Sequence, residues 1–446
     1  MFGTDGVRGT AGKYPLDRAT VRRLGAALVR VLPHRRASPR LLVGRDTRES
    51  GAWIEAELAH GASGEGAAVT SVGVVPTPAV AYLTRSAGYD AGVVISASHN
   101  PFEDNGIKVF SGRGEKFTER VEQEVEAIVA DDTWQAREGT AADVPHSDLV
   151  KAYLDHLRSV LPDHSPFNGL RLAIDCANGA TTPVAAELFR SVGVDVIVIG
   201  NEPDGRNINL NCGSTHPEKL AEVVVTTGAD IGVAFDGDGD RAIFVDGTGR
   251  IVNGDAVLLM CGRQLQREGR LNGNAIVATV MSNIGLEIAL RELGIGLVRC
   301  AVGDKYVMEE MLARRLSLGG EQSGHIIFSD YLFTGDGLCT ALNVLRTVGM
   351  TGRTLGNLAS ELVCYPQVLL NVRVRERIDL STVPAVAAAI ARVEARVAGR
   401  GRLLVRYSGT EPLLRVMLEG EDEQEIRAWA QEIVEVVNEQ IGEAAT

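Results

Sequence analysis

Cysteine is scarce in this sequence of 446 residues, and the six cysteines that occur are widely spaced. They are Cys176, Cys212, Cys261, Cys300, Cys339 and Cys364, and no two of them form a C-x-x-C pair. Structural zinc sites and disulfide-stapled small domains need regular cysteine spacings, so both are disfavoured. We expect most of these thiols to be buried and reduced.

The sequence also lacks any hydrophobic run long enough to span a membrane. Its first eight residues, MFGTDGVR, have neither the basic flank nor the apolar core of a signal peptide. No stripe of basic residues occurs, and the formal net charge of −13 makes nucleic acid a poor partner. We therefore expect a cytoplasmic protein that binds neither membranes nor nucleic acid.

Lysine is rare as well. The 45 basic residues include only Lys13, Lys108, Lys116, Lys151, Lys219 and Lys305 as lysines. The base composition of a genome is a sufficient explanation for a bias toward arginine, so the bias itself indicates no function. It does draw attention to Lys108, which follows a candidate functional loop.

What is present indicates a multidomain α/β protein. Hydrophobic residues make up 45% and charged residues 23% of the chain, and its length predicts three or four domains. Helical patterns alternate with short apolar strands, which are expected at 41–44, 69–75, 93–95, 170–174, 194–199, 231–235, 275–280 and 297–302. Further strands at 368–374, 403–405 and 414–418 and long helices at 383–397 and 423–441 predict a smaller α+β domain at the end.

We expect the domains to comprise residues 1–148, 149–253, 254–365 and 366–446. The first boundary follows a polar, aperiodic stretch at 130–147, which is typical of a linker. The predicted fold is three consecutive mixed α/β domains with helix-covered sheets, and a smaller C-terminal α+β domain, arranged around a central cleft. Each domain offers one functional loop, and a single shared site is the most economical arrangement.

The loop of the first domain contains a serine directly after a buried strand. The strand ends at S-A-S-H-N-P, because proline cannot continue it. Ser98 then lies at the carboxyl end of a buried strand, where open α/β sheets bind ligands. We expect Asn105, Gly106 and Lys108 to form a turn that returns a cation beside Ser98. A serine that only caps a turn is the simpler alternative, and a hydrolase nucleophile is disfavoured because G-x-S-x-G is absent.

The loop of the second domain is an alternating run of aspartates and glycines. Asp236, Asp238 and Asp240 can converge on one hard cation, while the glycines between them relieve the crowded backbone. An EF-hand is disfavoured, because its sixth position is Arg241 and its twelfth is Gly247. Three protein oxygens leave positions open, which suits magnesium with a phosphate ligand.

The loops of the last two domains have polar residues around glycine. The third domain contributes Glu321, Ser323 and His325, which suit hydroxyl recognition and proton transfer. A capping or core role for His325 is equally consistent with this stretch. The C-terminal loop is a candidate anion cradle that consists of Arg406, Ser408, Gly409, Thr410 and Arg415. An ordinary hairpin is its alternative, and no P-loop occurs in the chain.

In combination these motifs are much more specific. A-S-H-N-P, D-G-D-G-D-R, G-E-Q-S-G-H and R-x-S-G-T-E-P occur in that order, so the chain resembles the α-D-phosphohexomutase superfamily from end to end. Within it, F-G-T-D-G-V-R-G at the start, D-C-A-N-G-A from Asp175, C-G-S-T-H-P-E from Cys212 and V-G-D from Val302 are most similar to bacterial phosphoglucosamine mutases.

The resemblance implies an isomerase that interconverts glucosamine 6-phosphate and glucosamine 1-phosphate. It would work through a phosphoserine and a bisphosphorylated sugar, and would feed UDP-N-acetylglucosamine and cell-wall precursor synthesis. Ser98 would carry the phosphoryl group and, with Asp236, Asp238 and Asp240, hold one Mg²⁺ per active site. The implied catalytic residues are Ser98, Lys108, Arg241, His325, Arg8 and His99.

The same resemblance implies that Glu321 and Ser323 bind sugar hydroxyls, whereas the C-terminal cradle grips the phosphate that is not being transferred. A glucose- or glucosamine-type bisphosphate would serve as activator, and the protein would be a monomer or a homodimer. Phosphomannomutase and phosphoglucomutase activities remain alternatives. So do two functions of other classes, a phosphatase and a non-catalytic sugar-phosphate sensor.

Overall fold

The structure is a computed structural model that describes residues 1–3, 5–33, 38–137, 139, 144–161, 167, 169–408 and 413–443. The chain divides into two compact units. The first comprises Met1–Ser282 and Leu293–Glu361, and the second comprises Asn283–Glu292 and Leu362–Thr446. Four sheets are found among the described residues, and none mixes strands from two of the predicted domains. The exact domain boundaries and the central cleft stay predictions.

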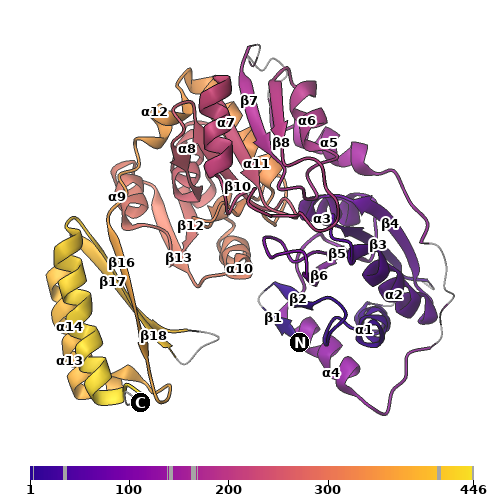
Figure 1. Ribbon diagram of the computed structural model, residues 1–446, viewed down its shortest axis with the longest axis horizontal. Helices are drawn as coiled ribbons and strands as arrows, with labels where there is room; N and C mark the ends of the chain where they lie inside the picture. Colours follow the sequence, from indigo (N-terminus) through magenta and orange to yellow (C-terminus); the bar gives the residue numbers. More distant parts are fainter. Residues whose placement is uncertain are drawn as a thin grey trace. The chain divides into compact units, whose positions relative to one another are not determined.

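The first sheet has six strands in the order β1-β2-β6-β5-β3-β4 (Figure 1). They are β1 Phe2–Gly3, β2 Gly6–Thr10, β3 Arg40–Arg45, β4 Ala68–Val74, β5 Ala91–Ile95 and β6 Asp104–Ser111. β3 is parallel to β4 and β5, whereas β6 is antiparallel to β5 and β2. The helices of this domain are α1 Arg18–Val31, α2 Gly51–Gly64, α3 Thr77–Ser86 and α4 Glu119–Ala130.

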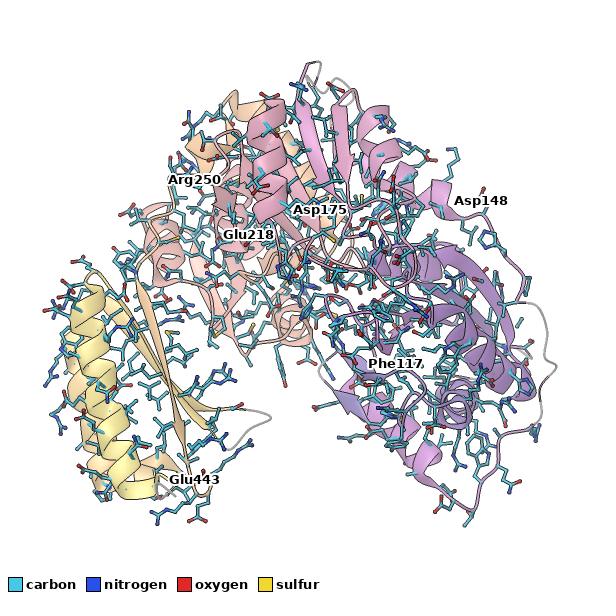
Figure 2. All side chains as sticks on the ribbon, viewed as in Figure 1. Phe117, Asp148, Asp175, Glu218, Arg250 and Glu443 are labelled. Atoms are coloured by element: carbon cyan, nitrogen blue, oxygen red, sulfur yellow. The ribbon has the colours of Figure 1, made fainter. Side chains whose placement is uncertain are left out.

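Helices α1 and α2 pack against each other unusually closely. A Cβ atom on Gly25 of α1 would lie 2.1 Å from the Leu58 carbonyl oxygen, and one on Gly61 of α2 would lie 1.8 Å from the Arg22 carbonyl oxygen. Only glycine fits at both positions. The apolar faces of the two helices and the strands enclose a core that includes Phe117, which is labelled in Figure 2.

The predicted turn at Asn105, Gly106 and Lys108 is wrong, because these residues belong to strand β6. Lys108 lies opposite Val94 of β5 in the antiparallel register. The strand is buried from Asn105 to Phe110, including its two polar side chains. An asparagine and a lysine within a short segment argue against a buried strand, because such side chains are rarely buried without a partner. In this strand their hydrogen-bond partners come from distant parts of the chain.

The second sheet has the order β11-β10-β9-β7-β8, with β7 parallel to β8 and β9. Its strands are β7 Arg171–Asp175, β8 Asp195–Ile199, β9 Ile231–Phe235, β10 Ala242–Asp246 and β11 Ile251–Val252, and its helices are α5 Val150–Arg158, α6 Ala185–Ser191 and α7 Glu218–Thr227. Asp175, which is labelled in Figure 2, ends β7. Its carboxylate accepts from the backbone N–H groups of Ala177 at 2.9 Å and Gly213 at 2.7 Å. These bonds fix the turn that follows the strand.

The third sheet has the order β13-β12-β14-β15. Its strands are β12 Ala275–Thr279, β13 Gly296–Cys300, β14 Leu318–Gly320 and β15 Ile326–Phe328, and the helices in the first unit are α8 Gly254–Arg267, α10 Asp304–Arg314, α11 Gly337–Thr351 and α12 Leu355–Ala359. Helix α9 Ile284–Glu292 lies within the range predicted for the third domain but groups with the second unit. Asn283 before it donates to the Tyr365 carbonyl oxygen at 2.9 Å and to Glu419 at 3.2 Å.

The second unit is built on an antiparallel sheet with the order β16-β18-β17. The strands are β16 Gln367–Arg373, β17 Gly401–Tyr407 and β18 Leu413–Gly420, and the helices after β16 are α13 Pro384–Val397 and α14 Glu423–Ile441. Both helices pack on one face of the sheet, with apolar residues from all three strands in a shared core. The α/β fold class with a smaller α+β end is therefore confirmed.

The prediction that most of the cysteines are buried can also be compared with the structure. Five of the six cysteines are buried and Cys364 is exposed, and all six are free thiols. Among the described residues, no helix combines the length and the apolar character that crossing a membrane requires.

Candidate active site

Ser98 lies directly beyond the buried end of β5, in a loop that is held from two domains. Its φ angle of 52° is left-handed, which is costly for a non-glycine residue unless its surroundings fix it. The Arg48 guanidinium donates to the carbonyl oxygens of Ser98 at 3.1 Å and Asn100 at 2.6 Å. The amide of Asn209, from the second domain, donates to the same two oxygens at 2.9 and 3.0 Å. The loop is thus fixed where the two domains meet.

The Ser98 hydroxyl is buried and faces the second domain. It donates to Asp236 Oδ2 at 2.5 Å, and His99 Nδ1 lies 3.4 Å from the same hydroxyl oxygen. Burial, followed by the nearby Arg241 and Arg8 cations, lowers the pKa of His99 to about 4. The imidazole is therefore neutral near pH 7, and can accept a hydrogen bond on one of its nitrogens.

Asp236, Asp238 and Asp240 converge in the loop between β9 and β10. All three are buried, and one oxygen from each lies within 4.8 Å of the other two. Gly239 has a φ angle of 71°, which lets the backbone turn so that the flanking carboxylates face the same point. Asp238 Oδ1 and Asp240 Oδ1 are buried, and neither has a hydrogen-bond partner in the part of the chain that the structure describes. Such oxygens suit a hard cation.

The three carboxylates share an excess of negative charge. Burial, and then the charges of Asp240 and Asp238, raise the pKa of Asp236 well above its ordinary value. Burial also opposes ionisation of Asp240, but Lys108 and His325 outweigh it and hold the pKa of Asp240 well below its ordinary value. A divalent cation would relieve this repulsion, so the residues present fit a metal ion.

Lys108 is the buried cation of this cluster. Its Nζ donates to Asp238 Oδ2 at 2.8 Å and to Asp240 Oδ2 at 3.4 Å. It also lies 2.9 Å from Asp5 Oδ2. Burial opposes the charge of Lys108, but these three carboxylates outweigh it and raise its pKa well above the ordinary value. The ammonium is therefore permanently charged at the site.

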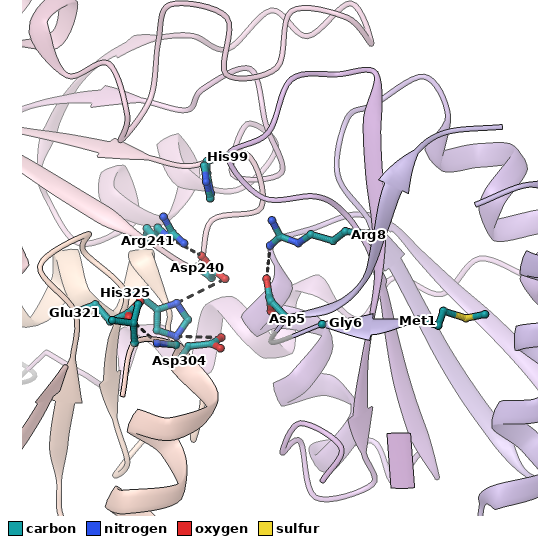
Figure 3. A pocket seen from close by; sticks show the side chains of 13 residues that line it. Met1, Asp5, Gly6, Arg8, His99, Asp240, Arg241, Asp304, Glu321 and His325 are labelled. Carbon is teal, nitrogen blue, oxygen red and sulfur yellow. Dashed lines mark hydrogen bonds and ion pairs between the residues drawn. The ribbon is translucent and has the colours of Figure 1, made fainter. Parts of the chain in front are cut away.

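A pocket of about 400 Å³ opens beside these groups within the first unit (Figure 3). Its lining residues come from all three α/β domains and are Met1, Gly3, Asp5, Gly6, Arg8, His99, Asp240, Arg241, Val302, Gly303, Asp304, Glu321 and His325. Five of the predicted site residues therefore meet here with Asp240. Ser323 is exposed and is not part of the lining.

His325 is buried between two carboxylates (Figure 3). Its Nδ1 lies 3.6 Å from Asp240 Oδ2, and its Nε2 lies 3.7 Å from Asp304 Oδ2. Burial favours the neutral imidazole, but Asp240, Asp304 and Glu321 outweigh it and raise the pKa of His325. The backbone N–H of Gly335 donates to Nε2 at 3.0 Å, so a neutral ring would carry its proton on Nδ1, facing Asp240.

The predicted phosphate cradle belongs to the second unit. Arg406 of β17 and Arg415 of β18 are register partners. Burial, and then the charge of Arg415, lower the pKa of Arg406. Ser408 is buried, and its backbone N–H donates to the Leu413 carbonyl oxygen at 2.8 Å. Gly409 and Thr410 lie outside the described residues.

Sequence reasoning missed several polar residues that hold this site together. They are Asp5, Arg48, Lys116, Asn209 and Asp304. Asp5 and Asp304 lie inside F-G-T-D-G-V-R-G and V-G-D, which served only as family motifs. The Nζ of Lys116 lies 2.5 Å from Asp5 Oδ1, and Lys116 also pairs with Asp304. Because lysine is rare in this chain, its rarity is a sequence signal that could have directed attention to Lys116.

Comparison with known proteins gives matches along the whole chain. Residues 1–136, 151–249 and 253–365 match the family models for alpha/beta/alpha domains I, II and III of phosphoglucomutase/phosphomannomutase. Residues 369–436 match the model for the C-terminal domain of the same family.

Individual relatives cover almost the full length. A phosphoglucosamine mutase of Solibacter usitatus is 50% identical, over 99% of this chain and 99% of the relative. One of Geotalea daltonii is 46% identical, over 99% and 98%. Among solved structures, a phosphoglucomutase/phosphomannomutase family protein from Burkholderia thailandensis has a TM-score of 0.80 at 25% identity and 98% coverage of both chains.

Proposed function

Because this chain belongs to the phosphoglucomutase/phosphomannomutase family, and within it to the phosphoglucosamine mutases, we propose that it interconverts glucosamine 6-phosphate and glucosamine 1-phosphate. One observation carries the chemical part of the proposal. The Ser98 hydroxyl lies 2.5 Å from Asp236, inside a cluster of buried carboxylates beside a pocket lined by arginine and histidine. A phosphoserine at this position would be next to both a metal site and the substrate.

In the proposed reaction, Ser98 begins as phosphoserine. The phosphorus–oxygen bond to Ser98 breaks as a bond forms to the C1 oxygen of glucosamine 6-phosphate, and the proton of that hydroxyl passes to the departing Ser98 oxygen. The product is a bisphosphate. It turns over, and its other phosphoryl group passes from the C6 oxygen back to Ser98, whose hydroxyl proton passes to the C6 oxygen as glucosamine 1-phosphate is released. Catalysis of such transfers is mostly positioning and electrostatic stabilisation.

The charged residues of the site suit these steps. Asp236, Asp238, Asp240 and the phosphoserine would hold one Mg²⁺, which would neutralise charge on the transferring group. Lys108 donates to Asp238 and Asp240 and holds these two carboxylates in place. Arg8 and Arg241 line the pocket, where guanidinium groups can bind phosphoryl oxygens.

The pocket also offers groups for the sugar and for its protons. Glu321 accepts from the Gly303 backbone N–H at 3.2 Å and keeps acceptor capacity for sugar hydroxyls. His325, with its raised pKa, is the group best suited to hold a proton at the pocket, whereas neutral His99 is a hydrogen-bond partner of the Ser98 hydroxyl.

Other parts of the proposal rest on the family. The C-terminal cradle would bind the phosphate that is not being transferred, and a glucose- or glucosamine-type bisphosphate would activate the enzyme. A cytoplasmic location, a role in supplying UDP-N-acetylglucosamine, and a monomeric or homodimeric state are further expectations. None of these depends on the geometry of Ser98.

The substrate assignment is tested by comparing kcat/KM for glucosamine, glucose and mannose 1-phosphates under one set of conditions. We expect glucosamine 1-phosphate to be preferred, with some activity on glucose 1-phosphate, because the hydroxyl contacts of Glu321 are common to both sugars. If glucose or mannose phosphate matches it, the chain is a phosphoglucomutase or phosphomannomutase instead.

The two functions of other classes give different results. A phosphatase releases inorganic phosphate from the phosphoserine in a single turnover, whereas a mutase transfers it to the sugar. A sugar-phosphate sensor binds ligand equally well after Ser98→Ala and turns nothing over.

A further inference from the structure

Two lysines connect the first domain to the third, and only one of them, Lys116, pairs with residues that line the pocket. Lys116 Nζ lies 2.5 Å from Asp5 Oδ1 and also pairs with Asp304 at the start of α10. Lys305, the next residue of α10, places its Nζ 2.9 Å from Glu122 Oε2 on α4. The two lysine side chains are 10% and 8% exposed. They are therefore closely matched in burial and in the domains that they join.

The Lys116 pairs complete a closed circuit of ionisable groups, which we name the charge ring. Its members, in order, are Asp240, Lys108, Asp5, Lys116, Asp304 and His325. Lys108 links Asp240 at 3.4 Å to Asp5 at 2.9 Å. His325 closes the ring, 3.7 Å from Asp304 and 3.6 Å from Asp240. Acidic and basic groups alternate, and all three α/β domains contribute.

We propose that Lys116 is a positioning residue, which clamps the Asp304 end of the third domain to Asp5 of the first domain so that the pocket keeps its shape. The inference rests on the proposed mutase function. Lys116 itself does not line the pocket, so it acts through other residues. Asp304 lines the pocket beside Gly303, whose N–H holds Glu321. A shift of this loop would move a proposed sugar-binding carboxylate and a neighbour of His325 together.

A purely structural link predicts a different behaviour. If Lys116 only joined two domains, its loss would lower stability in the same way as the loss of Lys305. If it positions the pocket, its loss would lower turnover as well, because misplacing reacting groups by about 1 Å can cost about 10²-fold in rate. Lys305→Met is therefore the matched control for Lys116→Met.

The experiment compares kcat, KM and Tm for the two methionine variants and for Lys116→Arg. We expect both methionine variants to lose a similar amount of thermal stability. Lys116→Met should lose about 10²-fold in kcat, and Lys305→Met should stay within about threefold of wild type. Lys116→Arg, which keeps the charge, should recover most of the lost rate. Equal activity losses in the two methionine variants, or a normal kcat in Lys116→Met, would overturn the proposal.

A second measurement does not depend on the reaction. Amide hydrogen exchange at residues 302–305 should become faster in Lys116→Met and in Asp304→Asn, and should stay at the wild-type rate in Lys116→Arg. If Lys116→Met does not fold, Asp304→Asn tests the clamp in its place. Unchanged exchange in Asp304→Asn means that no clamp exists. If the wild-type protein had no mutase activity, the proposed function would be wrong. The exchange rates would still show whether Lys116 holds Asp304 in place.

Discussion

Arg406 of β17 and Arg415 of β18 lie directly opposite each other across two antiparallel strands. Like charges in this register destabilise a sheet, and the effect is reversed when an anion binds between them. The neighbouring strand β16 adds Asn371, which is the register partner of Arg415 on its other side. Two guanidinium groups and an amide thus form one row across the sheet, which supports a phosphate site in the second unit.

The first prediction concerns this pair. Arg406→Lys should raise KM for the sugar phosphate by about tenfold or more, because an ammonium does not replace a bidentate guanidinium contact. It should also lower kcat, since the energy of binding the remote phosphate helps to position the reacting end. Steady-state kinetics of the variant provide the measurement. Wild-type values for both constants would mean that the row is structural.

The second prediction concerns the metal site. Asp238→Asn removes one charge from a carboxylate whose Oδ2 binds Thr77 and Lys108 and whose Oδ1 is buried without a hydrogen-bond partner in the described residues. We expect a higher Mg²⁺ midpoint for activity and a large loss of rate, with little unfolding. Asp195→Asn, at an exposed position of the same domain, is the control for a lost charge. An unchanged midpoint would exclude Asp238 as a ligand.

The third prediction concerns the pH dependence of stability. Burial raises the pKa of Asp336 from 3.8 to about 6, although Tyr153 donates to its carboxylate at 2.9 Å. A raised folded-state pKa means that the native state binds more protons than the unfolded chain between these values, so it loses stability as the pH rises through about 6.

Asparagine at position 336 can still cap α11 but cannot ionise. Relative to wild type, Asp336→Asn should therefore gain about 1.5 kcal/mol of stability between pH 5 and pH 7.5. Urea unfolding of both proteins at the two pH values measures the difference. A constant stability difference across this range would contradict the assignment.

Much of the fold follows from periodicity, because the buried parallel strands of the α/β domains are apolar and short. Periodicity predicts strand β5 at residues 93–95, and it comprises Ala91–Ile95; the long helix predicted at 423–441 is α14 Glu423–Ile441. Strand β6 escapes such reasoning because Asn105 and Lys108 are buried polar residues. Their hydrogen-bond partners, such as Ser50 and Asp238, are distant in sequence, so no local sequence pattern predicts these contacts.

The site residues also divide into those that a local sequence pattern predicts and those that it does not. Loops at strand ends are sufficient to select Ser98 and the three aspartates, and the structure brings these four residues together. The groups that hold the Ser98 loop, such as Arg48 and Asn209, follow from tertiary contacts alone. Ser323 lies outside this cluster, since its side chain is exposed and does not line the pocket, and its contact with a sugar hydroxyl stays a prediction.

The central claim is that Ser98 carries the phosphoryl group that reaches the sugar. Its most direct test is a single-turnover chase of protein labelled with radioactive phosphate at Ser98, in the presence of Mg²⁺ and unlabelled glucosamine 6-phosphate. The account predicts that the label leaves Ser98 and appears in glucosamine bisphosphate and glucosamine 1-phosphate, and that Ser98→Ala takes up no label and has no activity. Label released as inorganic phosphate, or normal turnover in Ser98→Ala, would contradict it.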